Sequence, residues 1–304
     1  MKTLFSKLLA SLAVMVTIGT VGPAAAEPGY EKAITERMHP QPTDRSVIAT
    51  ALRRDLLRVG VGLFEPWVMC DVNGDLIGYE IDVSRKLAED IGVRIQFVRT
   101  DWYFIIPSLI EEKFDLIISG MAITPKRSLH VNFSVPYSEF GTLVVANAMR
   151  TEGLSTLADF DSADVVFGAR AGTVPEQSVA DNFPKATVRT FDSDTGLLQA
   201  LVSGEVHVAA ADQIKATRWL DAHPEILHRP FSELFNKVPE AIALPKGDVD
   251  GLNFLDSWIA HHSTIGWLGE RRRYWFETRD WADLVATDLA VISRCNESFT
   301  LNSN

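Results

Sequence analysis

Strand-like and helix-like segments alternate along the chain, and this alternation occurs in two separate series. The first series has strand patterns at 56–62, 94–99 and 114–120, with helix patterns between them. Between the first two strands, Val83, Leu87 and Ile91 recur every four residues, as on one face of a helix, and Gly92 is a typical helix end. Alternation of this kind predicts an α/β fold with a largely parallel sheet.

The second series begins near residue 164. Its strand patterns lie at 164–170, 186–191 and 206–211, and its helix patterns at 178–183, 194–204 and 212–222. Two more strand-like segments, 142–149 and 240–247, bracket this series. The sequence therefore predicts two α/β lobes joined by two crossing segments, near 143–149 and 238–246, with a cleft between the lobes.

The first 26 residues have the pattern of a secretory signal peptide. Lys2 and Lys7 precede an apolar segment that runs from Leu8 to about Val21, and three alanines end at Ala26. A membrane anchor is the alternative, but the segment is shorter than the roughly 20 residues of a spanning helix. We expect export and cleavage near Ala26.

The predicted organisation follows from these patterns. The expected parts are the signal peptide (1–26), a linker with helical pieces (27–54), a discontinuous lobe 1 (55–143 and 240–290), lobe 2 (144–239) and a C-terminal tail (291–304).

Charge and metal-binding residues narrow the function. The formal net charge is −11, which makes a phosphate backbone a poor partner and excludes nucleic acid. The seven histidines are scattered, so we expect no metal site and no cofactor. Cys70 and Cys295 are the two cysteines; in an oxidising compartment they form one disulfide, and otherwise they are two free thiols.

Ligands of α/β sheets bind beyond the carboxyl ends of the strands. Four loops occupy such ends, and they read GLFEPW, GMAITPKR, RAGTVPE and ADQ. The candidate residues in and around them are Phe64, Trp102, Ser119, Gly120, Ala122, Thr124, Arg127, Arg170, Thr173 and Asp212.

Two of these residues suggest the ligand. The forked guanidinium of Arg127 suits a carboxylate, and the carboxylate of Asp212 suits an ammonium group. Together they describe a site for an α-amino acid. Each residue also has a simpler interpretation, since Arg127 could be a surface arginine and Asp212 a helix cap.

The same segments resemble a known family. LRVGV, FEPW, GDLIGYEIDVSRKLAEDIG and above all SGMAITPKR followed by FSVPY resemble the bacterial extracellular solute-binding proteins of family 3, the polar amino-acid-binding proteins of ABC importers. The resemblance covers roughly Leu56 to Glu277. It implies the two-lobed type II periplasmic binding protein fold with a double crossover hinge.

The resemblance also implies roles for individual residues. Arg127 would bind the substrate carboxylate with help from the Ala122 amide, and Asp212 would bind the amino group. Phe64 and Trp102 would sandwich the ligand. Ser119, Gly120 and Thr124 would line the amine side, and the loop at Thr173 would close on the carboxylate.

Three features of this chain bear on its ligand within the family pattern. Val174 stands where many members have a hydroxyl residue, which would remove one bond to the carboxylate. Arg170 stands where the family reads the substrate side chain, and a cation there favours an acidic or amide side chain. The first loop lacks the acid of members that bind basic amino acids.

A second resemblance offers an alternative. The segment SWIAHHSTIGWLGERRRYWFETRDW resembles the end of cyclohexadienyl (arogenate/prephenate) dehydratases, which share the fold. Glu176 would then be a general acid, a role that requires a raised carboxyl pKa. A Glu at this point also begins a helix in binding proteins, and we favour binding over catalysis.

The family implies further properties. They are capture of an amino acid by closure of the lobes, a periplasmic location, a monomer, and a permease of an ABC transporter at the inner membrane as the partner. Both cysteines would lie on lobe 1 in this fold, so a bond between Cys70 and Cys295 would tie the tail to the first hairpin.

Overall fold

The computed structural model describes residues 46–278, 280–286, 288, 290, 291 and 295. The predicted signal peptide, most of the linker after it and most of the tail lie outside the described residues. Within the described part, no helix is long and apolar enough to cross a membrane.

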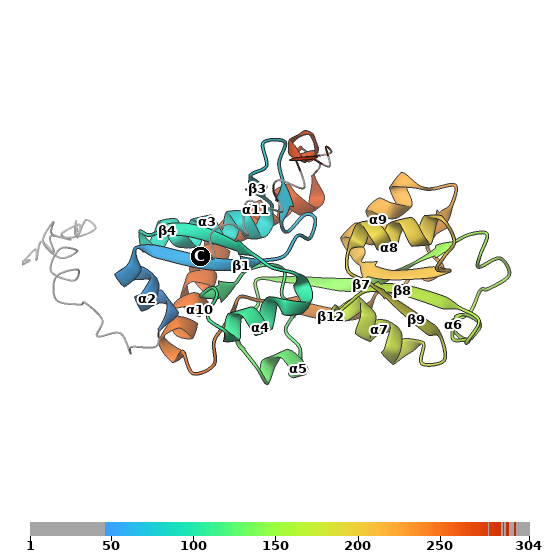
Figure 1. Ribbon diagram of the computed structural model, residues 1–304, viewed down its shortest axis with the longest axis horizontal. Helices are drawn as coiled ribbons and strands as arrows, with labels where there is room; N and C mark the ends of the chain where they lie inside the picture. Colours follow the sequence, from blue (N-terminus) through green and yellow to red (C-terminus); the bar gives the residue numbers. More distant parts are fainter. Residues whose placement is uncertain (1–45, 279, 287, 289, 292–294, 296–304) are drawn as a thin grey trace, which may run out of the picture. The chain divides into compact units, whose positions relative to one another are not determined.

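Two β-sheets organise the described residues (Figure 1). The strands of the first sheet are β1 (Leu56–Val61), β4 (Arg94–Arg99), β5 (Leu116–Ile117), β6 (Asn132–Phe133) and β13 (Ala243–Leu244). They lie in the order β4-β1-β5-β13-β6. Strand β1 runs parallel to β4 and β5, whereas β13 runs antiparallel to β5 and β6. We call this sheet with its helices lobe 1.

Helices cover both faces of the first sheet. Lobe 1 contains α2 (Val47–Arg54), α3 (Tyr79–Ile91), η1 (Trp102–Phe104), α4 (Ile105–Ile110), α5 (Pro125–Ser128), α10 (Val249–Thr264), α11 (Trp267–Glu277), η2 (Ala282–Leu284) and the hairpin of β2 (Met69–Cys70) and β3 (Leu76–Ile77). Successive strand residues point to opposite faces. Leu116 and Ile118 therefore pack in the core shared with α3, α10 and α11, while Ile117 packs with Leu109 of α4.

The second sheet forms lobe 2. Its strands are β7 (Ser138–Asn147), β8 (Val166–Arg170), β9 (Thr187–Phe191), β10 (Val208–Asp212), β11 (Leu227–His228) and β12 (Phe235–Glu240). The order is β11-β7-β10-β8-β9, with β12 also paired to β7. The helices are α6 (Leu157–Phe160), α7 (Val174–Asn182), α8 (Asp194–Val202) and α9 (Gln213–Ala222). Residues of β10 alternate between two cores, Ala209 with Leu197 of α8 and Ala210 with Val179 of α7.

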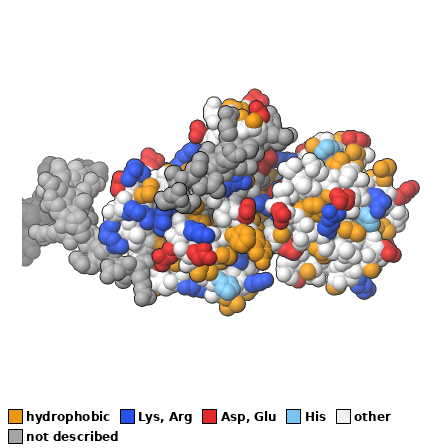
Figure 2. Space-filling model, in the orientation of Figure 1, with side chains coloured by type: hydrophobic (Ala, Val, Ile, Leu, Met, Phe, Trp, Pro, Cys, Tyr) orange, Lys and Arg blue, Asp and Glu red, His pale blue; other side chains and the backbone are white. Residues whose placement is uncertain are grey.

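Hydrophobic, acidic and basic side chains are mixed on the face shown in Figure 2. Both signs of charge occur on each lobe in this view. That face therefore presents no uniformly basic surface of the kind that holds a phosphate backbone.

The α/β class with a parallel β8, β9 and β10 is as the sequence predicts, but the first crossing differs. The chain passes between the sheets at 134–137 and at 241–242, because β6 belongs to lobe 1 and β7 already belongs to lobe 2. The predicted range 143–149 instead begins inside β7. The apolar pattern of 240–247 reads as one strand and contains the end of β12 and all of β13, in different sheets.

Two buried glutamates lie where the crossing segments meet. Tyr137, in the first crossing, donates from its backbone to the Glu240 carbonyl at 3.1 Å and from its hydroxyl to Glu80 at 2.6 Å. The Gly120 amide also donates to Glu80 at 2.9 Å, and the Trp67 indole donates to Glu240 at 3.2 Å. Burial raises the pKa of Glu80 to about 8 and the pKa of Glu240 to about 7. The crossing is thus built on carboxyl groups that favour the protonated state.

The raised pKa of Glu240 predicts a pH-dependent stability. A group that binds its proton more tightly in the folded state contributes stability below its unfolded pKa, and this stability is lost as pH rises through the folded pKa. For Glu240 the window runs from 4.5 to about 7. The neutral variant Glu240→Gln should gain on the wild type across this window, by up to about 1.4 kcal/mol per pH unit. Urea unfolding at pH 5 and pH 8 measures the difference.

The exposed Glu152 provides the matched control for this prediction. Glu152→Gln should leave the pH dependence of the wild type unchanged. A Glu240→Gln variant whose stability relative to the wild type is the same at both pH values would contradict a protonated Glu240.

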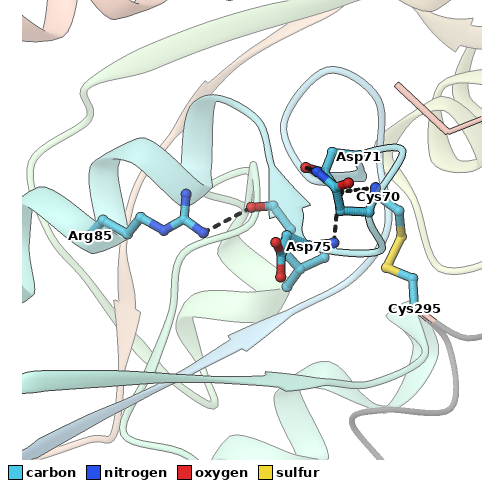
Figure 3. Close-up of a disulfide and its surroundings, with 7 residues drawn as sticks. Cys70, Asp71, Asp75, Arg85 and Cys295 are labelled. Atoms are coloured by element: carbon cyan, nitrogen blue, oxygen red, sulfur yellow. Dashed lines mark hydrogen bonds between the residues drawn. A yellow bond between two sulfur atoms is a disulfide. The ribbon is translucent and has the colours of Figure 1, made fainter. Parts of the chain in front are cut away.

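A disulfide joins the C-terminal tail to the β2–β3 hairpin (Figure 3). Cys70 and Cys295 are bonded with their Cα atoms 6.3 Å apart, across 225 positions of sequence. Next to this bond, Ala286 donates its amide to the Cys70 carbonyl at 2.9 Å, and Asp71 forms a β-bridge with Val285. The bond therefore adds a covalent link close to Val285 and Ala286, which already pair with the hairpin.

Removing this bond should destabilise the protein. Because it closes a long loop, we expect a double variant, Cys70→Ser with Cys295→Ser, to lose about 2–5 kcal/mol of unfolding free energy. Urea unfolding with and without reductant measures this. Reductant should lower the stability of the wild type and leave the double variant unaffected, and mass spectrometry that finds two free thiols in the untreated wild type would contradict the bond.

Candidate functional site

A pocket lies between the two lobes, and we call it the interlobe pocket. It is partly open to solvent, and its cavity volume is about 30 Å³. Lobe 1 lines it with Phe64, Trp102, Gly120, Ala122 and Arg127. Lobe 2 lines it with Phe140, Arg170, Thr173, Val174, Pro175, Asp194, Ala210, Ala211, Asp212 and Lys215. Eight of the ten predicted site residues therefore meet here, and the two that do not line the pocket are Ser119 and Thr124.

Arg127 is a partly buried cation in the wall from lobe 1. Its guanidinium donates to the carbonyls of Ala122, at 3.0 Å, and of Gly172 in lobe 2, at 3.1 Å. Burial lowers its pKa to about 10. No ion pair links Arg127 to a carboxylate within the described part of the chain. It is therefore suited to bind an anion.

Three predicted residues support this wall rather than offer side chains to the pocket. The Thr124 hydroxyl caps α5 by accepting from the Arg127 amide at 3.2 Å, which fixes the start of the turn that carries the arginine. The Ser119 hydroxyl is fully buried and is bonded to both backbone groups of Gly62, at 3.0 and 3.3 Å. Ala122 contributes its backbone, through its carbonyl.

Aromatic rings cover one side of the pocket. Phe64 and Trp102 are stacked with ring centroids 6.4 Å apart. The Trp102 indole donates to the Gly172 carbonyl at 3.2 Å, so it also contacts lobe 2. Such rings provide apolar surface and can pack against a cation.

Lobe 2 provides a buried acid that lines the pocket. Asp212 caps α9, and its Oδ1 accepts from the amides of Ile214 and Lys215 at 3.1 and 2.9 Å. Its Oδ2 is buried and has no hydrogen-bond partner among the described residues. Burial raises the pKa of Asp212 above its usual value, and the nearby Lys215 opposes only part of this shift. The helix-cap interpretation is therefore correct for one oxygen, and the other lies 3.4 Å from the Lys215 ammonium.

Arg170 and Thr173 differ in what they offer. The Arg170 Nη1 donates to the Leu63 carbonyl at 3.1 Å and to Asp194 at 3.2 Å, whereas its buried Nε has no partner in the described part. The Thr173 hydroxyl donates to the Arg170 carbonyl at 2.6 Å, so it holds the loop. Val174 lines the pocket with an apolar surface.

The sequence analysis did not identify two charged residues of the pocket, Lys215 and Asp194. Lys215 lies one helical turn after Asp212, a spacing that places both on one face of α9. Asp194 is the first residue of α8, just beyond the carboxyl end of β9. That loop occupies the same kind of strand end as the four inspected loops, and this position is the signal that could have found it.

Glu176 lies outside the pocket lining. Its carboxylate accepts from the Gly172 amide at 2.7 Å, in the first turn of α7. No cluster of three or more His, Cys, Asp or Glu side chains that could hold a metal occurs in the part of the chain that the structure describes. The site is thus a set of charged and aromatic groups around a pocket.

Known proteins resemble this chain in sequence and fold. A model of the bacterial extracellular solute-binding proteins, family 3, matches residues 57–278. The cyclohexadienyl dehydratase of Pseudomonas aeruginosa is 25% identical over 229 residues, which are 75% of this chain and 85% of the dehydratase.

Solved structures agree with this assignment. A putative binding component of an ABC transporter from Wolinella succinogenes, complexed with lysine, is 29% identical with a TM-score of 0.70, covering 76% of this chain and 99% of that one. An ancestral amino acid-binding protein described as a precursor of cyclohexadienyl dehydratase is 31% identical with a TM-score of 0.68 and the same coverage. The predicted two-lobed type II fold is confirmed by these likenesses.

Gly120 gives a test of the pocket floor. Its φ is +63°, and a Cβ added there would lie 2.8 Å from the Trp67 ring and 3.1 Å from Glu240 Oε1. Gly120→Ala should therefore cost about 1–3 kcal/mol of stability through overpacking and backbone strain. Gly269, in α11, has no atom within 4 Å of an added Cβ, so Gly269→Ala should be neutral or slightly stabilising. Equal urea midpoints for the two variants would contradict this packing.

Proposed function

The chain belongs to the bacterial extracellular solute-binding proteins of family 3, and we propose that it captures a polar amino acid with an acidic or amide side chain for an ABC importer. The lobes would close on the amino acid, and a permease at the inner membrane would receive it. We propose further that the chain acts as an exported periplasmic monomer after cleavage of its signal peptide near Ala26.

One observation carries this proposal: the interlobe pocket contains a partly buried arginine without a carboxylate partner and a buried aspartate with an oxygen that makes no hydrogen bond. Arg127 has no carboxylate partner in the described part of the chain, and the Oδ2 of Asp212 makes no hydrogen bond there, although the Lys215 ammonium lies 3.4 Å away. Unpaired buried charges are costly. The carboxylate and ammonium of one α-amino acid would satisfy both groups at once.

The remaining polar groups favour an acidic or amide side chain. Arg170 and Lys215 both line the pocket, and the Arg170 Nε lacks an acceptor. A lysine or arginine side chain would bring a further cation next to these two, which Coulomb repulsion opposes. The Wolinella succinogenes relative was solved with lysine, so we propose a ligand class that differs from that relative's.

Closure of the lobes fits the contacts across the pocket. Arg127 and Trp102 of lobe 1 both bond the Gly172 carbonyl of lobe 2, and Arg218 of lobe 2 pairs with Glu65 of lobe 1. Contacts of this kind can form only when the walls approach each other. They support a hinge motion at the two crossing segments as the capture step.

A second candidate is a cyclohexadienyl dehydratase, which the similarity to the Pseudomonas aeruginosa enzyme favours. In that case Glu176 would be the general acid. Its carboxylate instead accepts from the Gly172 amide, and the residue does not line the pocket. We therefore retain capture of an amino acid as the proposed function.

A thermal-shift screen of the exported protein tests the proposal. The panel contains the common amino acids, arogenate and prephenate, each also assayed for product. A ligand at about a hundred times its Kd should add about 2.7 kcal/mol of stability. Arg127→Met should weaken binding at least about 30-fold, because truncation of one partner in a buried charge pair costs about 2–5 kcal/mol.

Arg273→Met, at an exposed position of α11, is the control and should bind as the wild type does. A wild type that shifts with no amino acid contradicts the proposal. Phenylalanine or phenylpyruvate formed from the cyclohexadienyl acids would establish the dehydratase instead, with Glu176→Gln as the next variant.

A further inference from the structure

Lys215 is a buried lysine inside the interlobe pocket. Its ammonium lies 2.6 Å from Asp194 Oδ2, 3.4 Å from Asp212 Oδ2 and 3.8 Å above the centroid of the Phe64 ring. Its side chain is 9% exposed. Lys215 therefore places its ammonium group beside the Phe64 ring, in the wall of the pocket.

Arg170 shares the same carboxylate. Its Nη1 lies 3.2 Å from Asp194 Oδ2, the oxygen that Lys215 also contacts. Its Nε is buried without a partner among the described residues. One carboxylate thus serves two cations, and these three residues, which we call the Asp194 cluster, carry a net charge of +1.

We propose that the Asp194 cluster binds a second carboxylate, so that the ligand is a dicarboxylic amino acid, and that Lys215 determines the preference for an acid over its amide. This inference rests on the proposed function, because it takes Arg127 and Asp212 as the groups that hold the α-carboxylate and the ammonium.

The argument is one of charge neutrality. The three pocket cations Arg127, Arg170 and Lys215 outnumber the two acids Asp194 and Asp212 by one charge, and Lys215 contacts both acids. With the α-carboxylate on Arg127 and the ammonium beside Asp212, a zwitterionic ligand leaves this excess positive charge uncompensated in the pocket. A side-chain amide would give Arg170 Nε an acceptor and leave that charge in place. A side-chain carboxylate would do both, and a buried charge that is paired and hydrogen-bonded costs far less than one left alone.

Neighbouring charges do not change this balance. Glu65 pairs with Arg218 across the lobes. Burial and the nearby Arg170 lower the pKa of Arg99, and Asp101 opposes that effect. These neighbours are two acids and two bases, so the excess positive charge remains that of the Asp194 cluster.

Isothermal titration calorimetry tests the inference with glutamate, aspartate, glutamine, asparagine and lysine. The wild type should bind a dicarboxylic amino acid about tenfold or more tightly than its amide, as expected for one charge pair in a buried site. Lys215→Met keeps the length of the side chain and removes the charge. It should reduce the ratio of acid to amide affinity to below about threefold, mainly by weakening the acid.

Two further variants keep the test decisive. Lys126→Met, at an exposed position of α5, removes a lysine close to Arg127 but outside the pocket lining, and should preserve the wild-type ratio. Lys215→Arg keeps the charge and should keep the preference for the acid, which separates charge from packing if Lys215→Met does not fold.

Each remaining outcome overturns a different statement. A wild type that prefers the amide or lysine, or a Lys215→Met variant that weakens acid and amide equally, overturns the second-carboxylate subsite while capture of an amino acid stands. A wild type that binds no amino acid, in this panel or in the wider screen, overturns the proposed function as well.

Discussion

The constraint on which the site depends is a partly buried arginine that has no carboxylate partner among the described residues. Arg127 is held by a capped turn and by two carbonyl groups, one from each lobe. Carbonyl oxygens satisfy its donors and leave its charge uncompensated, and burial has already lowered its pKa. The fold therefore stabilises a cation whose natural partner must come from outside the chain. Asp212 lines the same pocket, so a ligand with both a negative and a positive charge would suit the two residues together.

Gly120 connects the pocket to the first crossing segment through Glu80. Gly120 lines the interlobe pocket, and its amide is bonded to Glu80, which also accepts from Tyr137 in the first crossing. Glu240, at the end of β12, lies against the same glycine. Movement of the lobes about 134–137 and 241–242 therefore acts on groups that contact the pocket floor. Ligand capture and the protonation of the two glutamates have a structural route to influence each other.

Much of the fold could be predicted from the sequence because it rests on local periodicity. The helix containing Val83, Leu87 and Ile91 and the alternation of strands and helices report the fold class directly. The position of the first crossing was predicted too late in the chain. The strand pattern was recognised only from residue 142, whereas β7 begins at Ser138. The carboxyl-end rule indicated Arg127, Arg170 and Asp212, which lie on such loops. It missed Asp194 because one strand end was not inspected, and Lys215 because its position depends on the rotation of α9.

The fold alone does not decide the ligand, since this scaffold accommodates lysine in the Wolinella succinogenes relative and catalysis in the Pseudomonas aeruginosa dehydratase. In this chain Arg170 and Lys215 of lobe 2 share Asp194, and we propose that these residues select the ligand. Lobe 1 can bind the α-carboxylate, which all amino acids have in common. In the proposed mechanism the residues of lobe 2 would meet the ligand as the lobes close, so their charge would act when water is excluded and electrostatic discrimination is strongest. A general capture step on lobe 1 followed by selection on lobe 2 accounts for both halves of the pocket.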